Sequence, residues 1–193
     1  MARSPKLRVV PLTQERWDDF ERLFGPRGAC GGCWCMTPRL TSAQYAQRKG
    51  AGNRRAMRAL VERGPAPGLL AYRGKEPVGW CALAPREEYV RYARSRVAKP
   101  LDARPAWMIA CLFVRPDERG KGVSEALVRA AIAHAKKHGG ERIEAFPVEP
   151  RAGQELVPVF AWTGIASTFT RAGFEEVARR TPTRPYLRRE LGT

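Results

Sequence analysis

The sequence predicts a single α/β domain of the α+β kind, with one mixed, mostly antiparallel sheet, a central parallel pair of strands and flanking helices. Strand-like and helix-like segments alternate along all 193 residues, a length that suits one domain with a sizeable core. In the middle, a strand, a helix and a second strand follow one another, and such a unit forms a parallel crossover. Hairpin patterns on either side of this unit predict antiparallel neighbours.

The amino-terminal third predicts one strand and two helical regions. Residues 7–12 alternate weakly, and Pro11 favours an edge strand. Thr13 is a candidate N-cap for a helix that ends at Gly25, because large apolar residues recur behind it at helical spacing. The second helical region opens at Thr41 or Ser42, is interrupted near residues 50–52, and ends at Gly64.

The rest of the chain supplies the sheet. Residues 68–72 and 77–83 form a hairpin pattern, and the strongly apolar segment 107–114 is typical of a central strand. After it the pattern predicts these elements: a helix over 123–138, a strand over 142–148, a helix over 165–172, and strands over 174–179 and 185–191.

Composition limits the function classes. The apolar runs are shorter than the roughly 18 residues of a membrane helix, and the basic amino terminus lacks the apolar stretch of a secretory signal. Five cysteines, an odd number, argue against a disulfide framework and favour the cytoplasm. The formal net charge of +16 favours anionic partners.

The sharpest local signal is a glycine loop, Arg119-Gly120-Lys121-Gly122-Val123-Ser124, between the apolar strand and a helix. Small residues let backbone N–H groups approach a ligand, and the helix start adds unpaired donors and a partial positive charge, which suits phosphate. An ordinary glycine turn is the alternative. The Walker pattern is absent, and the dinucleotide pattern fails at Glu125, although Glu141 is spaced as a ribose partner would be.

Residues 111–127, Cys-Leu-Phe-Val-Arg-Pro-Asp-Glu-Arg-Gly-Lys-Gly-Val-Ser-Glu-Ala-Leu, resemble the acyl-coenzyme A motif of the GNAT N-acetyltransferase superfamily. That motif is Arg/Gln-x-x-Gly-x-Gly/Ala after a Leu-x-Val strand. Residues 169–174 also resemble the late helix of the family, which ends in Gly-Phe. The order of elements matches the family over nearly the whole chain, so one N-acetyltransferase domain is expected over residues 1–193.

The resemblance implies acetyl-CoA as co-substrate and no metal. Backbone groups of Leu112, Phe113 and Val114 would pair with the pantetheine arm as an added strand would. Amides of the loop would hold the pyrophosphate, with these residues as the cofactor-binding set: Arg119, Gly120, Lys121, Gly122, Val123 and Ser124. An amine would attack the thioester directly, with a backbone N–H near Val114 polarising its oxygen.

Three departures from the family pattern concern proton transfer. The usual tyrosine falls on Phe169, the usual asparagine on Trp162, and a strand acid found in some members on Met108. Ser124 replaces the last small residue of the motif and adds a hydroxyl near a phosphate.

Candidates for the proton steps are Glu144, Glu88 and its neighbour Glu87, together with Ser167 and Thr168 as a relay through water. The alternative for each carboxylate is a solvent-facing position that answers the excess of arginine, and for each hydroxyl residue an ordinary packing or surface position.

The cysteine-rich loop predicts an acceptor pocket lined by Trp34, Cys35 and Met36, because this region borders the acceptor in the resembled fold. Cys30, Cys33 and Cys35 could suggest a zinc site, but a structural zinc ion needs four ligands and the sequence has no second cysteine pair. The two histidines, His134 and His138, lie far away in the sequence on an amphipathic helix. No metal site is therefore expected.

The predicted function is transfer of an acetyl group from acetyl-CoA to a primary amine, on a small molecule, in a monomer or homodimer. A protein amine is the alternative acceptor. A basic nucleic-acid-binding or regulatory module that keeps the fold without catalysis is a second hypothesis. It rests on the charge and the missing tyrosine, although nucleic-acid-binding motifs are absent.

Overall fold

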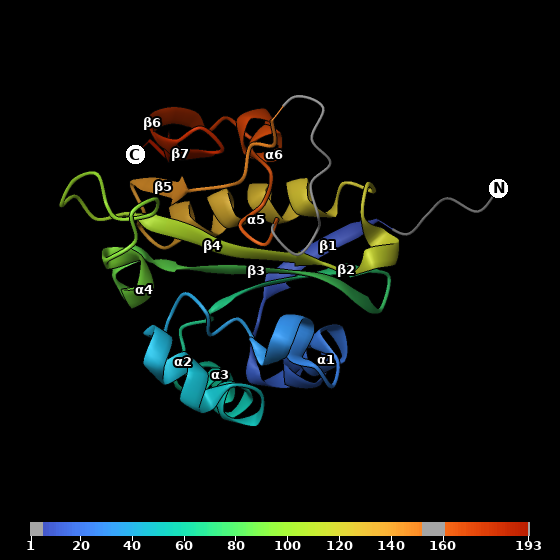
Figure 1. The fold of residues 1–193 in the computed structure, drawn as a ribbon. Helices are drawn as coiled ribbons and strands as arrows, with labels where there is room; N and C mark the ends of the chain where they lie inside the picture. Colours follow the sequence, from blue (N-terminus) through green and yellow to red (C-terminus); the bar gives the residue numbers. More distant parts are fainter. Residues whose placement is uncertain (1–5, 152–160, 193) are drawn as a thin grey trace.

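The computed structural model describes residues 6–151 and 161–192, which form one seven-stranded sheet with helices on both faces (Figure 1). The strand order is β1-β2-β3-β4-β5-β7-β6. The strands are β1 (Leu7–Pro11), β2 (Gly68–Arg73), β3 (Glu76–Pro85), β4 (Trp107–Val114), β5 (Arg142–Ala145), β6 (Glu175–Thr181) and β7 (Arg184–Glu190). The helices are α1 (Trp17–Phe24), α2 (Ser42–Arg48), α3 (Ala51–Arg63), α4 (Val90–Ala93), α5 (Val123–Lys137) and α6 (Ala166–Arg171).

All neighbouring strands run antiparallel except β4 and β5, which run parallel. Helix α5 connects these two strands, so the predicted crossover and fold class are confirmed. The parallel ladder is short, because it pairs only Trp107 with Ile143 and Met108 with Glu144. Beyond Met108, β4 continues without β5 beside it.

Both faces of the sheet are covered. Helices α1, α2 and α3 lie on one face, and α5 and α6 lie on the other (Figure 1). Strand β3 shows why both faces bury apolar side chains, because Trp80 and Ala82 belong to the cluster under α1 and α3, whereas Cys81 and Leu83 belong to the cluster under α5.

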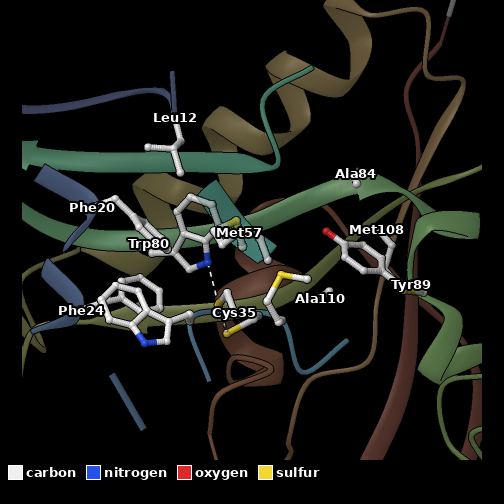
Figure 2. Close-up of a cluster of buried hydrophobic side chains, with 14 of the residues drawn as sticks. Leu12, Phe20, Phe24, Cys35, Met57, Trp80, Ala84, Tyr89, Met108 and Ala110 are labelled. Atoms are coloured by element: carbon white, nitrogen blue, oxygen red, sulfur yellow. Dashed lines mark hydrogen bonds between the residues drawn. The ribbon is translucent and has the colours of Figure 1, made fainter. Parts of the chain in front are cut away.

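The cluster under α1 is built on stacked aromatic side chains (Figure 2). The Phe20 ring centroid lies 4.1 Å from that of Phe24 and 4.9 Å from that of Trp80. Phe20 and Trp80 are fully buried. The large apolar residues that recur at helical spacing after Thr13, and that predict a helix from the sequence, are thus the residues that pack α1 against the centre of the sheet.

Strand β4 carries a β-bulge. Ala82 of β3 pairs with Cys111 and Leu83 pairs with Ile109, which leaves Ala110 as an extra residue. The bulge breaks the alternation of side chains, so Ala110 and Cys111 both join the cluster under α1, while Ile109 and Leu112 face α5.

Several element boundaries differ from the sequence predictions. Helix α1 begins only at Trp17, after a 3-10 turn, because the Thr13 hydroxyl accepts from Arg16 Nη1 at 2.9 Å and makes no cap. Thr41 is the true cap of α2, where its hydroxyl accepts from the Gln44 N–H. Strand β5 ends at Ala145 rather than at residue 148. Helix α4 lies in a segment between the predicted strands 77–83 and 107–114 that is rich in basic residues, among them Arg91, Arg94, Arg96, Lys99 and Arg104, and for which no element was expected.

None of the described helices combines the length and apolarity needed to cross a membrane. Within the described residues, no three histidine, cysteine, aspartate or glutamate side chains are gathered as metal ligands would be. Part of the basic amino terminus, residues 1–5, lies outside the described residues.

The aromatic cluster predicts a strong dependence of stability on Phe20. Replacing it (Phe20→Ala) should lower the free energy of unfolding by about 3–5 kcal/mol, because the substitution leaves a cavity among well-packed rings. Val177→Ala is the control, since Val177 is 44% exposed on β6, and it should cost less than about 1 kcal/mol. Urea unfolding of both variants measures the difference, and equal losses would contradict this view of the core.

Candidate functional site

A cavity of ≈ 990 Å³ lies where β4 ends, α5 begins and α6 passes nearby. Strand β4 contributes Leu112, Phe113 and Val114. The loop and the start of α5 contribute Arg119, Gly120, Gly122, Val123 and Ser124. The structure thus brings together eight of the nine predicted cofactor-binding residues in one cavity; Lys121 does not line it.

The open edge of β4 arises because β5 diverges after Met108. In this region the Leu112 N–H donates to the carbonyl oxygen of Trp162 at 2.7 Å. The Leu112 N–H therefore already has a partner, whereas the resemblance implied that it would pair with the pantetheine arm. Peptide groups alternate along a strand, and the Arg115 N–H donates to Val78 of β3, so the Val114 N–H and carbonyl face the cavity side, where the carbonyl accepts from Arg119 Nε at 3.4 Å.

The glycine loop has the backbone that the sequence predicts for a close approach. Gly120 and Gly122 have φ of 72° and 79°, a region that favours glycine. A Cβ atom at either position would meet no atom within 4 Å and would project into open space. Gly122 is the N-cap of α5 and supplies no side-chain cap, so the first amides of this 15-residue helix lack intrahelical partners.

Charge around the loop is arranged in pairs. Glu118 is buried and bonds Arg73 Nε at 2.8 Å, which anchors the turn before the glycines. Glu125 pairs with Arg129 at 2.9 Å and with Arg171 at 3.2 Å, and these hydrogen bonds lower the pKa of Glu125. Arginines thus neutralise the carboxylates near the start of α5. Because these carboxylates do not repel an anion, the helix dipole favours binding of an anion at this end of the helix.

Helix α6 borders the cavity with hydroxyl groups. Ser167 is exposed and Thr168 is nearly buried, and both line the cavity beside the glycine loop. Phe169 is fully buried and stacks edge-on against Phe174 at 5.3 Å, so this helix offers no aromatic hydroxyl there. Among the predicted proton-transfer residues, Ser167 and Thr168 are thus brought to the cavity of the cofactor-binding loop.

Glu144 has a different setting from the one expected of a base. It is fully buried, and its Oε2 accepts from Arg86 Nη1 at 2.8 Å and from the Tyr186 hydroxyl at 2.7 Å. Its Oε1 accepts from Arg188 Nε at 2.9 Å and Nη2 at 2.6 Å. Burial, and then the nearby carboxylate, raise the pKa of Tyr186. Since both oxygens are engaged, Glu144 serves to neutralise two arginines between strands rather than to take a proton.

Glu88 and Glu87 lie outside the cofactor-binding cavity. Glu88 is 38% exposed and ion-paired with the buried Arg39, whose guanidinium lies over the Tyr89 ring. Glu87 borders a second cavity on the side of α4. Neither carboxylate is placed beside the glycine loop.

The expected acceptor-lining residues Trp34, Cys35 and Met36 are buried in the core, with exposed fractions of 5%, 2% and 4%. Trp34 stacks on Phe24, and Cys35 accepts a hydrogen bond from the Trp80 indole N–H, drawn dashed in Figure 2. They do not line the cavity, because the strained loop turns them inward. Its earlier residue, Cys30, borders the cavity instead.

The second cavity, of ≈ 1000 Å³, was not anticipated from the sequence. Tyr89, Arg91 and Tyr92 line it, together with other residues from the basic segment. The Tyr92 hydroxyl donates to the Ala110 carbonyl oxygen at 3.1 Å, at the bulge of β4. One lining residue, Tyr92, is therefore hydrogen-bonded to β4 two residues before Leu112, which lines the first cavity. The clustered aromatic and basic residues at 89–94 were its sequence signal.

Comparisons with known proteins agree with this geometry. The model of the acetyltransferase (GNAT) family matches residues 34–156. A search of curated protein sequences finds no significant match. Among solved structures, a mosquito arylalkylamine N-acetyltransferase like 5b aligns with TM-score 0.59 at 13% identity, over 96% of this chain and 100% of that chain.

Two microbial structures align similarly. One, described as histone acetyltransferase HPA2 and related acetyltransferase from Corynebacterium glutamicum, has TM-score 0.54 and 19% identity over 97% of each chain. The PaiA N-acetyltransferase from Thermoplasma acidophilum, in complex with coenzyme A, has TM-score 0.54 and 10% identity, over 96% of this chain and 99% of that chain. At these identities the alignments establish the shared fold.

The buried position of Glu144 predicts a structural phenotype. Glu144→Gln should lower the free energy of unfolding by about 3–5 kcal/mol, because two arginines would lose their buried counterion. Glu176→Gln removes a carboxylate from a 39% exposed pair with Arg179 and should cost about 1 kcal/mol or less. Thermal and urea unfolding measure both losses. If Glu144→Gln has normal stability but no activity, the result would instead support Glu144 as the catalytic base.

Proposed function

The chain belongs to the acetyltransferase (GNAT) family, and we propose that it transfers the acetyl group of acetyl-CoA to the primary amine of a small molecule. One observation carries the proposal: the free edge of β4 and the amino terminus of α5 meet in a single cavity. The matched residues 34–156 contain both elements.

The cavity suits the two chemical halves of acetyl-CoA. The Val114 peptide group, on the side that β5 leaves open, can bond a pantetheine amide as a neighbouring strand would. The first amides of α5 can bond the pyrophosphate, and the helix dipole favours its charge. Arg119 and Lys121 add positive charge, with Lys121 56% exposed beside the loop. The open space over Gly120 and Gly122 allows the phosphates to approach the backbone.

The reaction is direct attack by the amine on the thioester carbonyl. A C–N bond forms, the C–S bond breaks, and the coenzyme A sulfur leaves as a thiolate. A backbone N–H stabilises the charge that develops on the carbonyl oxygen. With Phe169 in place of a tyrosine, thiolate departure relies on the low pKa of thiols, about 8.5. The attacking nitrogen loses its proton to water held by Ser167, which borders the same cavity.

The acceptor site is assigned to the second cavity, on the far side of the β4 bulge. Tyr92 lies between this cavity and the strand, with its hydroxyl on Ala110. Arg91 and Arg94 border the cavity, so it favours an acceptor that carries an acid group as well as its amine. A cavity volume of ≈ 1000 Å³ suits a small molecule.

An acceptor screen tests this assignment. Coenzyme A release from acetyl-CoA would be followed with amino acids and other acidic amines, with neutral and polycationic amines, and with peptides. Fastest turnover with a small acidic amine is expected. Turnover confined to peptides would overturn the small-molecule acceptor, and coenzyme A binding without any turnover would favour a non-catalytic role.

Gly122 provides a test of cofactor binding. Gly122→Val should weaken acetyl-CoA binding by about tenfold or more, because its side chain would fill the space over the loop. Gly139→Val is a matched control at the other end of α5, with φ of 75° and equally open surroundings. Calorimetric titration compares the two variants, whose backbone strain is similar. Equal affinities would remove the glycine loop from the site.

Ser167 provides a test of proton transfer. Ser167→Ala should lower kcat by about tenfold with little change in the KM for acetyl-CoA, because only the proton relay is lost. Thr170→Ala is the control, since its hydroxyl donates to the Ser167 carbonyl oxygen within α6 and does not line the cavity. Steady-state kinetics with the best acceptor measures both. An unchanged kcat in Ser167→Ala would exclude the relay.

A further inference from the structure

Three cysteines lie close together where the loop after α1 packs against strand β4. They are Cys33 and Cys35 of the loop and Cys111 of the strand. The Cys35 and Cys111 sulfur atoms are 3.2 Å apart, although 75 residues separate them in the chain. Cys33 lies two residues before Cys35 in the same loop. Cys33 is partly exposed, whereas Cys35 and Cys111 are buried. One partly accessible thiol thus lies near two buried ones.

The fold holds these thiols together by two irregular features. The bulge at Ala110 turns the Cys111 side chain to the face that carries Cys35, because regular alternation would point it toward α5. The loop contributes three residues with positive φ other than glycine, namely Ala29 at 64°, Trp34 at 43° and Cys35 at 52°. Strain of this kind persists only where surrounding contacts impose it.

The surroundings of Cys33 favour its thiolate. In the neutral form its thiol donates to the Gly28 carbonyl oxygen at 3.3 Å. Once ionised, the sulfur accepts from the Cys35 thiol and from backbone N–H groups of the loop, and these bonds lower the pKa of Cys33 to about 6 although burial opposes the change. Burial raises the pKa of Cys35. The attacking thiol and the resolving thiol are therefore chemically distinct.

We propose that Cys33, Cys35 and Cys111 form a thiol-oxidation site, in which hydrogen peroxide oxidises Cys33 and the oxidation is passed inward to a Cys35–Cys111 disulfide. A disulfide needs sulfur atoms about 2.05 Å apart, so the pair must close by a little over 1 Å. This site is separate from acetyl transfer, because none of the three cysteines lines either cavity.

The chemistry balances in three steps. The Cys33 thiolate attacks one peroxide oxygen, the O–O bond breaks, and the released hydroxide takes a proton to become water, leaving Cys33 as a sulfenic acid. The Cys35 sulfur attacks Cys33, which forms a Cys33–Cys35 disulfide and releases a second water. The Cys111 sulfur then attacks Cys35, which forms Cys35–Cys111 and returns Cys33 as a thiol. Two thiols are oxidised and one peroxide is reduced to two waters.

Peptide mapping of the whole protein tests the proposal. The native protein would be treated with hydrogen peroxide, quenched in acid, alkylated and digested, and its disulfides identified by mass spectrometry. A Cys35–Cys111 crosslink that a dithiol reverses is expected. A final Cys33–Cys35 disulfide, or irreversible oxidation of Cys33 with no crosslink, would overturn the relay.

Variants separate the relay from direct oxidation of the buried pair. Cys33→Ser should slow formation of the Cys35–Cys111 crosslink by about tenfold, since the accessible thiolate is lost. Cys81→Ala is the control, because Cys81 is equally buried on the adjacent strand but faces α5, and it should leave the rate unchanged. The crosslink forming at the normal rate in Cys33→Ser would contradict the proposal. The native-protein mapping stands by itself if a variant fails to fold.

Discussion

Strand β4 carries two irregularities, one that opens the first cavity and one that receives a hydrogen bond from a residue lining the second. It loses its parallel neighbour β5 after two paired residues, and it accommodates an extra residue at Ala110. Backbone polar groups need partners, and the Leu112 N–H takes the Trp162 carbonyl. The Val114 peptide group instead faces the first cavity, while the carbonyl of the bulge receives the Tyr92 hydroxyl at the second. A regular, fully paired β4 would close the first cavity and leave the second without this link to the strand.

Several of the arginines behind the net charge of +16 have identifiable roles in the structure. Glu144 neutralises Arg86 and Arg188 in the interior, where an isolated guanidinium would be costly. Around the helix start, carboxylates are already paired with arginines. The donors of the glycine loop, and Arg91 and Arg94 at the second cavity, add positive potential where an anion could bind. Such a surface suits an anionic cofactor and an acidic acceptor better than a cationic one.

Much of the fold could be predicted from periodicity, because the apolar spacing of α1, α5 and the central strand is strong. The glycine loop was also predictable, since its residues are contiguous. The bulge at Ala110 was not, because it depends on pairing with β3 and leaves no mark in the sequence of β4. The role of Glu144 was missed for a similar reason: its arginine and tyrosine partners come from distant segments. Cys35 and Met36 were expected at a pocket but are buried in the core, and Trp34 borders a separate cavity of ≈ 560 Å³; the positive φ angles of Trp34 and Cys35 are not indicated by sequence patterns.

In the complex that we propose, acetyl-CoA binds across the open edge of β4 and the amino terminus of α5. Amide hydrogen exchange, measured by mass spectrometry with and without acetyl-CoA, tests it most directly. Exchange in the segments that contain residues 113–114 and 122–125 should slow by about tenfold or more, while α1 and α3 stay unchanged. Unaltered exchange in those two segments at saturating acetyl-CoA, or protection confined to another region, would contradict the account.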